Sequence, residues 1–336
     1  MRPIPLLLSL VILAVSMLAA LLSGAAGIPV GAILAELADK LPLVTADSGL
    51  TPVEQGLLLE LRLPRVVLAA LVGGLLAAAG AGYQGVFRNP LADPYLLGAA
   101  AGAGLGATAV IVLAGDADAI AIPVAAFAGA VGGVLLAYLL GSVAGRAGGI
   151  APLVLAGVAV SSFLAAVQTF LQQLEVEELR RIYGWILGDV GGGWSQVLLI
   201  APYAAVSMGF LLAYGRLLDV LAVGDDEAVS LGVNAVRVRF AVLFAASLAT
   251  ASAVAVSGLI GFVGIVVPHV VRRLAGGSYR SVLPLSLIGG GAFLVLADLA
   301  ARTVMAPAEL PIGVVTAFVG APFFIVVLRL TRRSET

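Results

Sequence analysis

The sequence contains no cysteine, a single histidine and a single lysine. The lack of cysteine excludes disulfide bonds, thiolate catalysis and cysteine-based metal sites. Because His269 is the only histidine, no two-histidine metal motif can form within one chain. Lys40 lies between Asp39 and Leu41, whereas a Walker A phosphate loop needs lysine between glycine and serine or threonine. We therefore expect no catalytic site, no metal site and no ATP binding through such a loop.

Charge is also scarce, since charged residues make up 11% of the 336 residues and hydrophobic residues 61%, with a mean hydropathy of +1.15. An average soluble domain has about a quarter charged residues and about half apolar ones. A soluble protein of this size could not bury so much apolar surface, so the composition predicts an all-α integral membrane protein. The net charge of −1 offers no basic surface for nucleic acid.

Stretches without Asp, Glu, Lys or Arg locate the membrane helices, each of which needs about 20 apolar residues. Nine stretches occur, at 3–35, 66–87, 94–115, 119–145, 147–174, 190–215, 240–271, 281–297 and 310–328. The stretch 240–271 is interrupted at Ser257-Gly258, at Gly261 and at Gly264, and we expect its second helix to end at Pro268. This punctuation predicts two short helices there. The chain is thus expected to form about ten transmembrane helices in one domain, residues 1–336.

Basic residues are distributed unevenly over the connections. With ten spans both termini lie on one side, and the connections on that side carry 12 of the 18 basic residues. Because basic residues concentrate in cytoplasmic connections, both termini are predicted to be cytoplasmic. A cleaved signal peptide is the alternative for the first span, since Arg2 precedes an apolar run. The run is long for a signal peptide, so we expect it to remain as a span.

Three connections are long enough to hold structure. Residues 36–65 form an acid-rich external segment. Residues 175–189 are charged at their start and apolar after Ile182, a pattern that predicts an external amphipathic helix. Residues 216–239 form the largest cytoplasmic connection.

Local signals within 216–239 predict a short helical hairpin. Gly224 is followed by three acidic residues, which is typical of a helix start. Gly232 and Asn234 then interrupt the segment. A hairpin of this kind is suited to docking a soluble partner.

The hexapeptide 80–85 matches the pattern GxGxxG of dinucleotide-binding folds. That function requires a strand before the motif and a helix after it, whereas here a charge-free span precedes it. Close packing of helices through small residues explains the motif better. The same holds for the glycines spaced by four residues at Gly98, Gly102 and Gly106, and at Gly129 and Gly133.

Charges are nearly absent from the spans, which argues against an ion-coupled transporter. Asp298 lies one helical turn before Arg302, so the two are expected to form a local ion pair. In the fifth span, Gln168 and Gln172 belong to a polar set that either forms interhelical hydrogen bonds or lines a translocation path. We favour the path. His269 is expected to be structural.

Arg62 and Arg65 flank Pro64 at the external start of the second span. They could anchor the helix at the membrane interface. They could instead form, with Arg302, a basic patch for an acidic partner. Spacing alone leaves both interpretations open.

Three long motifs resemble those of the FecCD-type permeases, the membrane subunits of ATP-binding-cassette (ABC) importers for iron–siderophores, haem and cobalamin. They are RLPRVVLAALVGGLLAAAGAGYQGVFRNPLADPYLLG (62–98), GLIGFVGIVVPHVVRR (258–273) and ELPIGVVTAFVGAPFF (309–324). The resemblance runs through nearly the whole chain, with the motifs in the expected order.

The resemblance implies a type II ABC importer permease fold, with ten helices per subunit and an inverted repeat. It implies a homodimer with a central path in the cytoplasmic membrane of a bacterium or archaeon. Two cytoplasmic ATPases would use ATP and Mg, and a periplasmic or lipid-anchored binding protein would deliver the chelate. The permease itself would be surrounded by membrane lipid and would bind no cofactor.

The resemblance also implies residue roles. The docking arginines of the family match Arg62, Arg65 and Arg302. The ATPase-coupling segment matches 219–233, within 216–239, where we select Asp219, Gly224, Asp225, Asp226, Glu227, Leu231 and Gly232. The cytoplasmic gate matches Asn89, Pro90 and Leu91, with a second gate segment at Ile150 and Ala151.

The substrate is not determined by these motifs. We rank an iron–siderophore first, cobalamin second and haem third, and we expect residues 175–193 and the fifth span to vary with the ligand. An ion-coupled secondary transporter and a membrane anchor for an enzyme complex are the competing interpretations. The second is disfavoured because no histidine pair could ligate haem.

Overall fold

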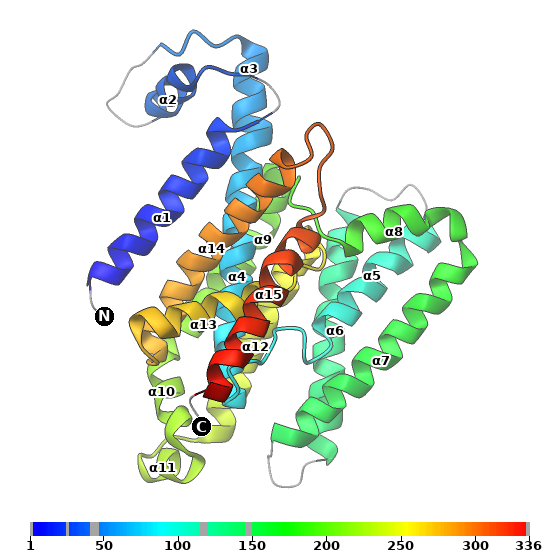
Figure 1. Ribbon diagram of the computed structural model, residues 1–336. Helices are drawn as coiled ribbons and strands as arrows, with labels where there is room; N and C mark the ends of the chain where they lie inside the picture. Colours follow the sequence, from blue (N-terminus) through cyan, green and yellow to red (C-terminus); the bar gives the residue numbers. More distant parts are fainter. Residues whose placement is uncertain (1–2, 25–26, 41–46, 115–119, 145–149, 334–336) are drawn as a thin grey trace.

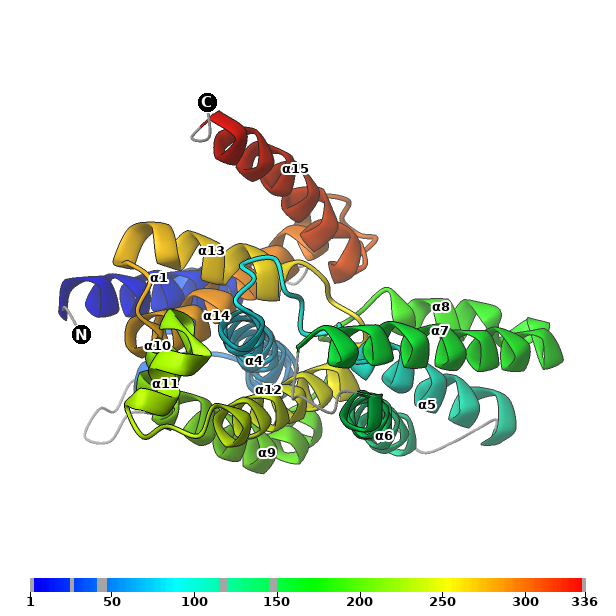
Figure 2. The ribbon, with the colours of Figure 1, turned by 90° about the horizontal axis from the view of Figure 1, so that it is seen from below.

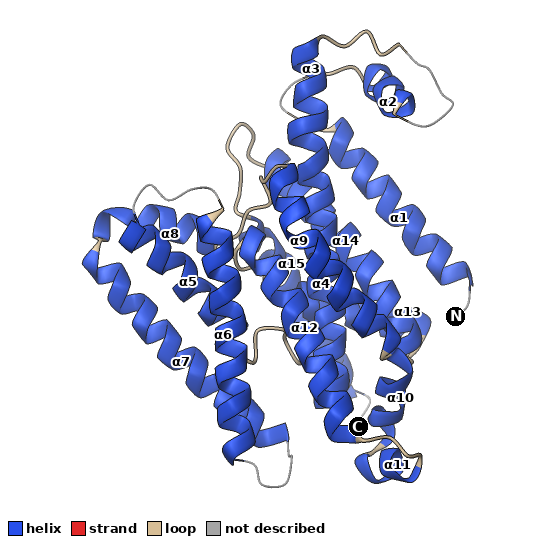
Figure 3. Ribbon diagram, turned by 180° about the vertical axis from the view of Figure 1, so that it is seen from behind, coloured by secondary structure: helices blue, strands red, loops and turns tan. Residues whose placement is uncertain are grey.

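The computed structural model describes residues 3–24, 27–40, 47–114, 120–144 and 150–333, and every regular element within them is a helix (Figures 1 and 3). Seven helices are long and apolar enough to cross a membrane. They are α1 (Pro3–Leu22), α4 (Leu63–Phe87), α6 (Ala121–Ala144), α7 (Ile150–Leu174), α9 (Trp194–Ala213), α12 (Ala235–Ser257) and α14 (Tyr279–Thr303). This confirms the predicted all-α membrane fold.

Three further helices agree with the count of about ten. They are α5 (Ala99–Ala114), α13 (Val263–Ala275) and α15 (Ile312–Arg333). The connections hold α2 (Val30–Asp39), α3 (Pro52–Gly56), η1 (Leu57–Arg62), η2 (Val176–Glu178), α8 (Leu179–Ile186), α10 (Gly215–Val223) and α11 (Asp225–Ser230). The amphipathic helix predicted within 175–189 is thus present as α8. The inverted repeat and the single domain stay predictions.

Helix α4 occupies the centre of the bundle. It contacts α1, α9, α12, α13 and α14, which surround it in the view along the bundle (Figure 2). Its residues from Val72 to Phe87 are all buried. Helices α5, α6 and α7 form a second group, which α12 joins to the first through contacts with α5 and α6.

Small residues allow helix backbones to touch. A Cβ atom at Gly80 of α4 would lie 2.0 Å from the carbonyl oxygen of Gly264 in α13. In the second group, a Cβ atom at Gly102 of α5 would lie 2.1 Å from the carbonyl oxygen of Gly129 in α6. The glycine motif 80–85 therefore lies inside a membrane helix and packs against its neighbours, as predicted.

The long apolar stretch 240–271 is divided into two helices, as predicted. Gly258 ends α12 with a φ of +66°, a left-handed conformation that glycine adopts without strain. Phe262 precedes α13 with a φ of +69°.

Pro268 does not end the second of these helices, contrary to our expectation, because α13 continues to Ala275. Proline lacks the N–H that would bond to the carbonyl oxygen four residues earlier, here that of Gly264. The side chain of Gln84 in α4 donates a hydrogen bond to this oxygen at 3.0 Å. The helix can therefore pass through Pro268 without leaving a buried carbonyl unpaired.

The second span begins earlier than the charge-free stretch 66–87. Helix α3, the π-helix η1 and α4 form one continuous helical segment from Pro52 to Phe87. Thr51 and Glu54 form a reciprocal capping box at its start. Charged residues such as Glu60 lie within this segment, so a search for charge-free stretches truncates it.

The start of α1 and the end of α15 lie toward the end of the molecule that carries α10 and α11 (Figure 1). Helices α2 and α3 lie at the opposite end. We call these the α11 end and the α2 end. The side of the membrane on which each terminus lies stays a prediction.

Candidate functional sites at the two ends of the bundle

The three arginines predicted to dock a partner lie together at the α2 end, with Asp298 and Glu309. We call these five residues the Arg65 cluster. Asp298 is fully buried and forms ion pairs with Arg65 and with Arg302, each at 2.9 Å between nitrogen and oxygen. The pair with Arg302 is the local contact that the sequence predicts, whereas the contact with Arg65 joins α14 to α4.

Glu309 covers the other side of the Arg65 guanidinium. The two terminal nitrogens of Arg65 donate to the two carboxylate oxygens of Glu309 at 3.3 and 2.8 Å. Glu309 is 52% exposed, whereas the Arg65 side chain is only 16% exposed. The Arg65 guanidinium is therefore paired with two carboxylates of the same chain, those of Asp298 and Glu309.

Arg62 and Arg302 are directed at the end of α1. Arg302 donates to the carbonyl oxygens of Ser23 and Ala20, each at 3.3 Å, and Arg62 donates to that of Leu21 at 3.4 Å. The last carbonyls of a helix have no partner within it and carry partial negative charge, so arginines stabilise them. The structure thus brings the predicted docking arginines together, and their docking role stays a prediction.

At the α11 end, α10 and α11 form the hairpin that the sequence predicts. We call residues 215–231, from the start of α10 to the residue that caps α11, the α11 hairpin. Gly224 precedes α11, and the three acidic residues occupy its first turn. Gly232, with a φ of +74°, ends it, because its N–H bonds to the carbonyl of Val229 and the next N–H, of Val233, bonds to Ala228. Asn234 then caps the start of α12.

Two of the predicted coupling residues turn inward. Asp219 of α10 accepts hydrogen bonds from the backbone N–H of Tyr279 and the hydroxyl of Ser278, at the start of α14. Asp225 of α11 forms ion pairs with Arg88 and Arg239. The hydrogen bond from Arg239, followed by the contacts with Arg88, holds the pKa of the Asp225 carboxyl below its ordinary value.

Other predicted coupling residues turn outward. Asp226, Glu227 and Leu231 are exposed, and so are Val223 and Val229 beside them. Helix α11 lies at one end of the molecule, below α10 in the view of Figure 1. The hairpin therefore presents an exposed face that is both acidic and apolar, and such faces are typical of interaction sites.

The predicted gate residues Asn89, Pro90 and Leu91 form an exposed turn directly after α4. The Asn89 side chain accepts a hydrogen bond from the Leu91 N–H at 2.9 Å, which stabilises the turn. Ala151 of the second predicted gate segment is exposed in the first turn of α7, and the side chain of Ile150 lies outside the described residues. The gating role of both segments stays a prediction.

Polar residues of α7 form local and interhelical hydrogen bonds. Gln168 donates to the hydroxyl of Thr108 in α5 at 3.2 Å, so it links two helices. Gln172 is half-buried one turn further on. A role of either residue in a translocation path stays a prediction.

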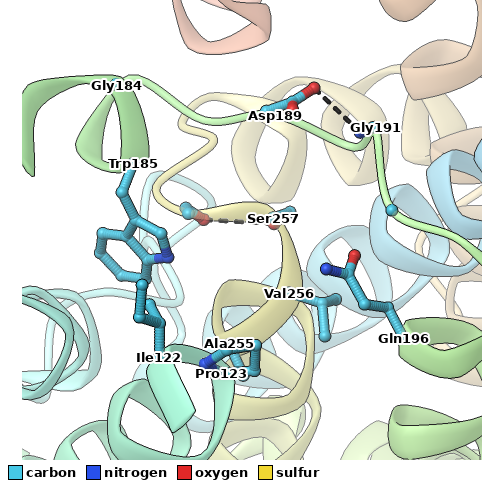
Figure 4. A pocket seen from close by; sticks show the side chains of 12 residues that line it. Ile122, Pro123, Gly184, Trp185, Asp189, Gly191, Gln196, Ala255, Val256 and Ser257 are labelled. Carbon is cyan, nitrogen blue, oxygen red and sulfur yellow. Dashed lines mark hydrogen bonds between the residues drawn. The ribbon is translucent and has the colours of Figure 1, made fainter. Parts of the chain in front are cut away.

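A cavity of about 330 Å³ lies between the ends of α6, α8 and α12 (Figure 4). The indole ring of Trp185 and the amide of Gln196 reach into it from opposite sides. The amide oxygen of Gln196 is buried and finds no hydrogen-bond partner among the described residues. Five lining residues belong to the segment expected to vary with the ligand: Gly184, Trp185, Asp189, Gly191 and Gly192.

Comparison with known proteins decides the family. The sequence pattern of the FecCD transport family matches residues 12–330. The chain belongs to the FecCD transport family.

Curated relatives of this FecCD chain include the cobalamin import system permease protein BtuC of Halobacterium salinarum, 42% identical over 80% of this chain and 72% of the relative. The Fe(3+) dicitrate transport system permease protein FecD of Escherichia coli is 38% identical over 80% of this chain and 83% of the relative. A solved structure described as an inward-facing metal-chelate type ABC transporter superposes with a TM-score of 0.84 at 29% identity, covering 98% of this chain and 99% of that chain. These likenesses confirm the predicted ABC permease fold.

Three contact-forming residues of this FecCD chain escaped the sequence analysis. They are Arg88 and Arg239, which hold Asp225, and Glu309, which holds Arg65. The sequence alone places Arg88 and Arg239 only among the basic residues of the predicted cytoplasmic connections, because the partner of each lies outside its own helix. Their positions in the sequence could have indicated a role, since Arg88 directly precedes the predicted gate turn and Glu309 is the first residue of the third family motif.

Proposed function

We propose that this FecCD chain is the permease subunit of an ATP-driven, binding-protein-dependent importer for a metal chelate. Two copies form the path, and two separate cytoplasmic ATPases bind ATP and Mg. A periplasmic or lipid-anchored binding protein docks at the α2 end. The chain itself binds no cofactor and carries out no chemistry, and it lies in the cytoplasmic membrane of a bacterium or archaeon with both termini in the cytoplasm.

The observation that carries this proposal is the two-sided α11 hairpin. Its inward carboxylates, Asp219 and Asp225, hold the ends of membrane helices. Its outward residues, such as Glu227 and Leu231, remain available to a soluble protein. A segment that binds a partner on one side and helix ends on the other can convert movement of the partner into movement of the helices.

An ion-coupled secondary transporter is less compatible with the charges. Coupling ions or protons need ionisable groups along the path within the membrane. Asp298, the fully buried acidic residue of the described spans, is paired with two arginines at the α2 end. Such pairing favours a structural role over proton transfer, and energy would then come from another subunit.

Helices α7 and α15 supply exposed apolar surface for the second copy and for lipid. Phe163 and Phe170 of α7 and Phe318 of α15 are each more than half exposed. Helix α15 contacts α13 and α14 and stands out from the bundle (Figure 2).

In the proposed cycle, ATP binding closes the ATPases and shifts the helices between outward-open and inward-open populations.

The substrate class rests on the relatives. One relative is named for cobalamin and another for iron dicitrate, at 42% and 38% identity. These two sequence identities are too similar to distinguish a corrinoid substrate from an iron chelate. We place an iron–siderophore first, with cobalamin second and haem third.

Purification with the binding protein and ATPases tests the function. We expect the complex to accumulate ferric siderophore in proteoliposomes when ATP is present, with uptake unaffected by protonophores and sodium ionophores. Elemental analysis and mass spectrometry of the captured ligand then identify the chelate. Cobalt in a corrinoid would place cobalamin first among the substrates and would not affect the proposed transport mechanism. Uptake that collapses with an ion gradient while ATP is intact would overturn the proposal in favour of a secondary transporter.

A further inference from the structure

Arg88 has a backbone conformation that favours glycine. It follows the last residue of α4 with φ 49° and ψ 33°, in the left-handed region. Helices commonly end on a residue of this conformation, and that residue is usually glycine because a Cβ atom is disfavoured there. An arginine at such a position suggests that its side chain has a role that glycine could not perform.

The side chain of Arg88 contacts both helices of the α11 hairpin. Its Nε donates to the carbonyl oxygen of Leu221 at 2.8 Å, in the last turn of α10, where carbonyls lack a partner within the helix. Its Nη2 forms an ion pair with Asp225, the first residue of α11. Contact at two points fixes the direction of the planar guanidinium, which a single contact would not do.

Asp225 is shared with a third helix. Arg239 of α12 binds both oxygens of the same carboxylate. One side chain of α11 therefore holds the end of α4 and the first turns of α12 together. We call Arg88, Asp225 and Arg239 the Asp225 joint.

The 89–91 turn begins at the next residue. Its first N–H, that of Asn89, bonds back to the carbonyl oxygen of Gln84 in α4, and the N–H of Ala92 bonds to the carbonyl of Asn89. The turn is therefore built on the backbone at Arg88. A displacement of the α11 hairpin that keeps both contacts of Arg88 therefore pulls on this backbone and on the turn.

We propose that Arg88 is the positioning residue that transmits movement of the α11 hairpin to the 89–91 turn, acting through the carboxylate that it shares with Arg239. This inference rests on the proposed function, because the hairpin moves only if an ATPase docks on it. It assigns transmission to Arg88 and leaves docking to the outward residues of the hairpin.

The decisive variant is Arg88→Gly, because glycine accepts the left-handed backbone and only the side chain is lost. In the complete complex we expect the ATPases to remain bound and ATP hydrolysis to stay within about twofold of wild type, while substrate transported per ATP falls about tenfold. Arg88→Lys is expected to restore part of the loss, since lysine can reach one acceptor but not fork to two. Arg280→Ala, which removes an exposed arginine from the first turn of α14, is the matched control and should change neither quantity.

A wild-type yield of transport per ATP in Arg88→Gly would overturn the proposal. Loss of ATPase association in the same variant would also overturn it, because Arg88 would then support docking rather than transmission.

A second measurement needs no ATPase and so separates this inference from the proposed function. In the purified chain, hydrogen exchange at the backbone amides of Asn89, Leu91 and Ala92 should be faster in Arg88→Gly and in Asp225→Asn than in wild type, and unchanged in Arg280→Ala. Equal exchange in all four proteins would contradict the joint itself. If the wild-type chain binds no ATPase, the proposed function is contradicted, but the exchange measurement still tests the Asp225 joint.

Discussion

The Arg65 cluster and the Asp225 joint are both arginine–carboxylate networks at helix ends, but they differ in burial. In the Arg65 cluster the central carboxylate, Asp298, is fully buried, and its partners Arg65 and Arg302 are 16% and 9% exposed. In the Asp225 joint the central carboxylate is 46% exposed, and Arg88 and Arg239 are 35% and 12% exposed. The two networks have similar chemistry in different surroundings.

Burial decides what such a network contributes. A buried charge that loses its partner is strongly destabilising, because neither water nor another group replaces the partner. An exposed ion pair contributes little to stability, since water solvates the separated charges nearly as well. The Arg65 cluster therefore holds the α2 end together, whereas the Asp225 joint sets the relative positions of helix ends at small cost when it opens.

The largest expected effect is that of Asp298→Asn. The variant keeps the shape of the side chain but removes the charge that Arg65 and Arg302 face inside the protein. We expect a loss of about 3–5 kcal/mol in unfolding free energy. Denaturation of the purified chain in detergent measures it, with Glu309→Gln as the exposed control from the same cluster, for which a loss below about 1 kcal/mol is expected. Equal stability of the two variants would contradict the difference in burial.

A smaller effect is expected from Glu309→Gln on binding-protein association. Glu309 occupies the exposed side of Arg65, where an acidic group of a docking partner would bind. Removing its charge should free the guanidinium and strengthen association by about two- to fivefold. Surface plasmon resonance on the membrane complex measures this. Glu60→Gln is the control, because it removes the charge of an exposed acidic residue that does not belong to the Arg65 cluster. Weaker association in Glu309→Gln would show that Glu309 itself contacts the partner.

The smallest effect concerns pH at the Asp225 joint. The pKa of Asp225 is lowered from its ordinary 3.8 by the hydrogen bond from Arg239, so the joint stabilises the fold fully above about that pH. The contribution is lost as the pH falls through the lowered, folded-state pKa. Exchange of the α11 amides, corrected for intrinsic rates, should therefore be constant from neutral pH down to that region and then rise. Asp225→Asn should show the faster exchange at neutral pH and no such rise.

Local features of the chain were predictable because their causes are local. Gly258 divided the long apolar stretch, and Gly224 and Gly232 bounded α11, because each acts on the backbone of its own neighbours. The Asp298–Arg302 pair followed from helical periodicity.

The partners across the fold were not predictable. Arg65 and Asp298 are 233 residues apart, and Arg88 and Asp225 are 137 apart, so no spacing rule connects them. The continuation of α13 through Pro268 depends in the same way on Gln84, a side chain of another helix. A single sequence shows which groups need a partner, whereas the packing of helices decides which group supplies it.

Helix α11 has only six residues. Isolated helices shorter than about 12–15 residues are marginal in water, so α11 owes its existence to the contacts that hold it against α4 and α12. An ATPase that recognises folded α11 would therefore bind one arrangement of these helix ends more tightly than any other. By thermodynamic reciprocity, the same preference means that a chelate or binding protein that alters this arrangement from the far side of the membrane would change the affinity for the ATPase by an equal factor.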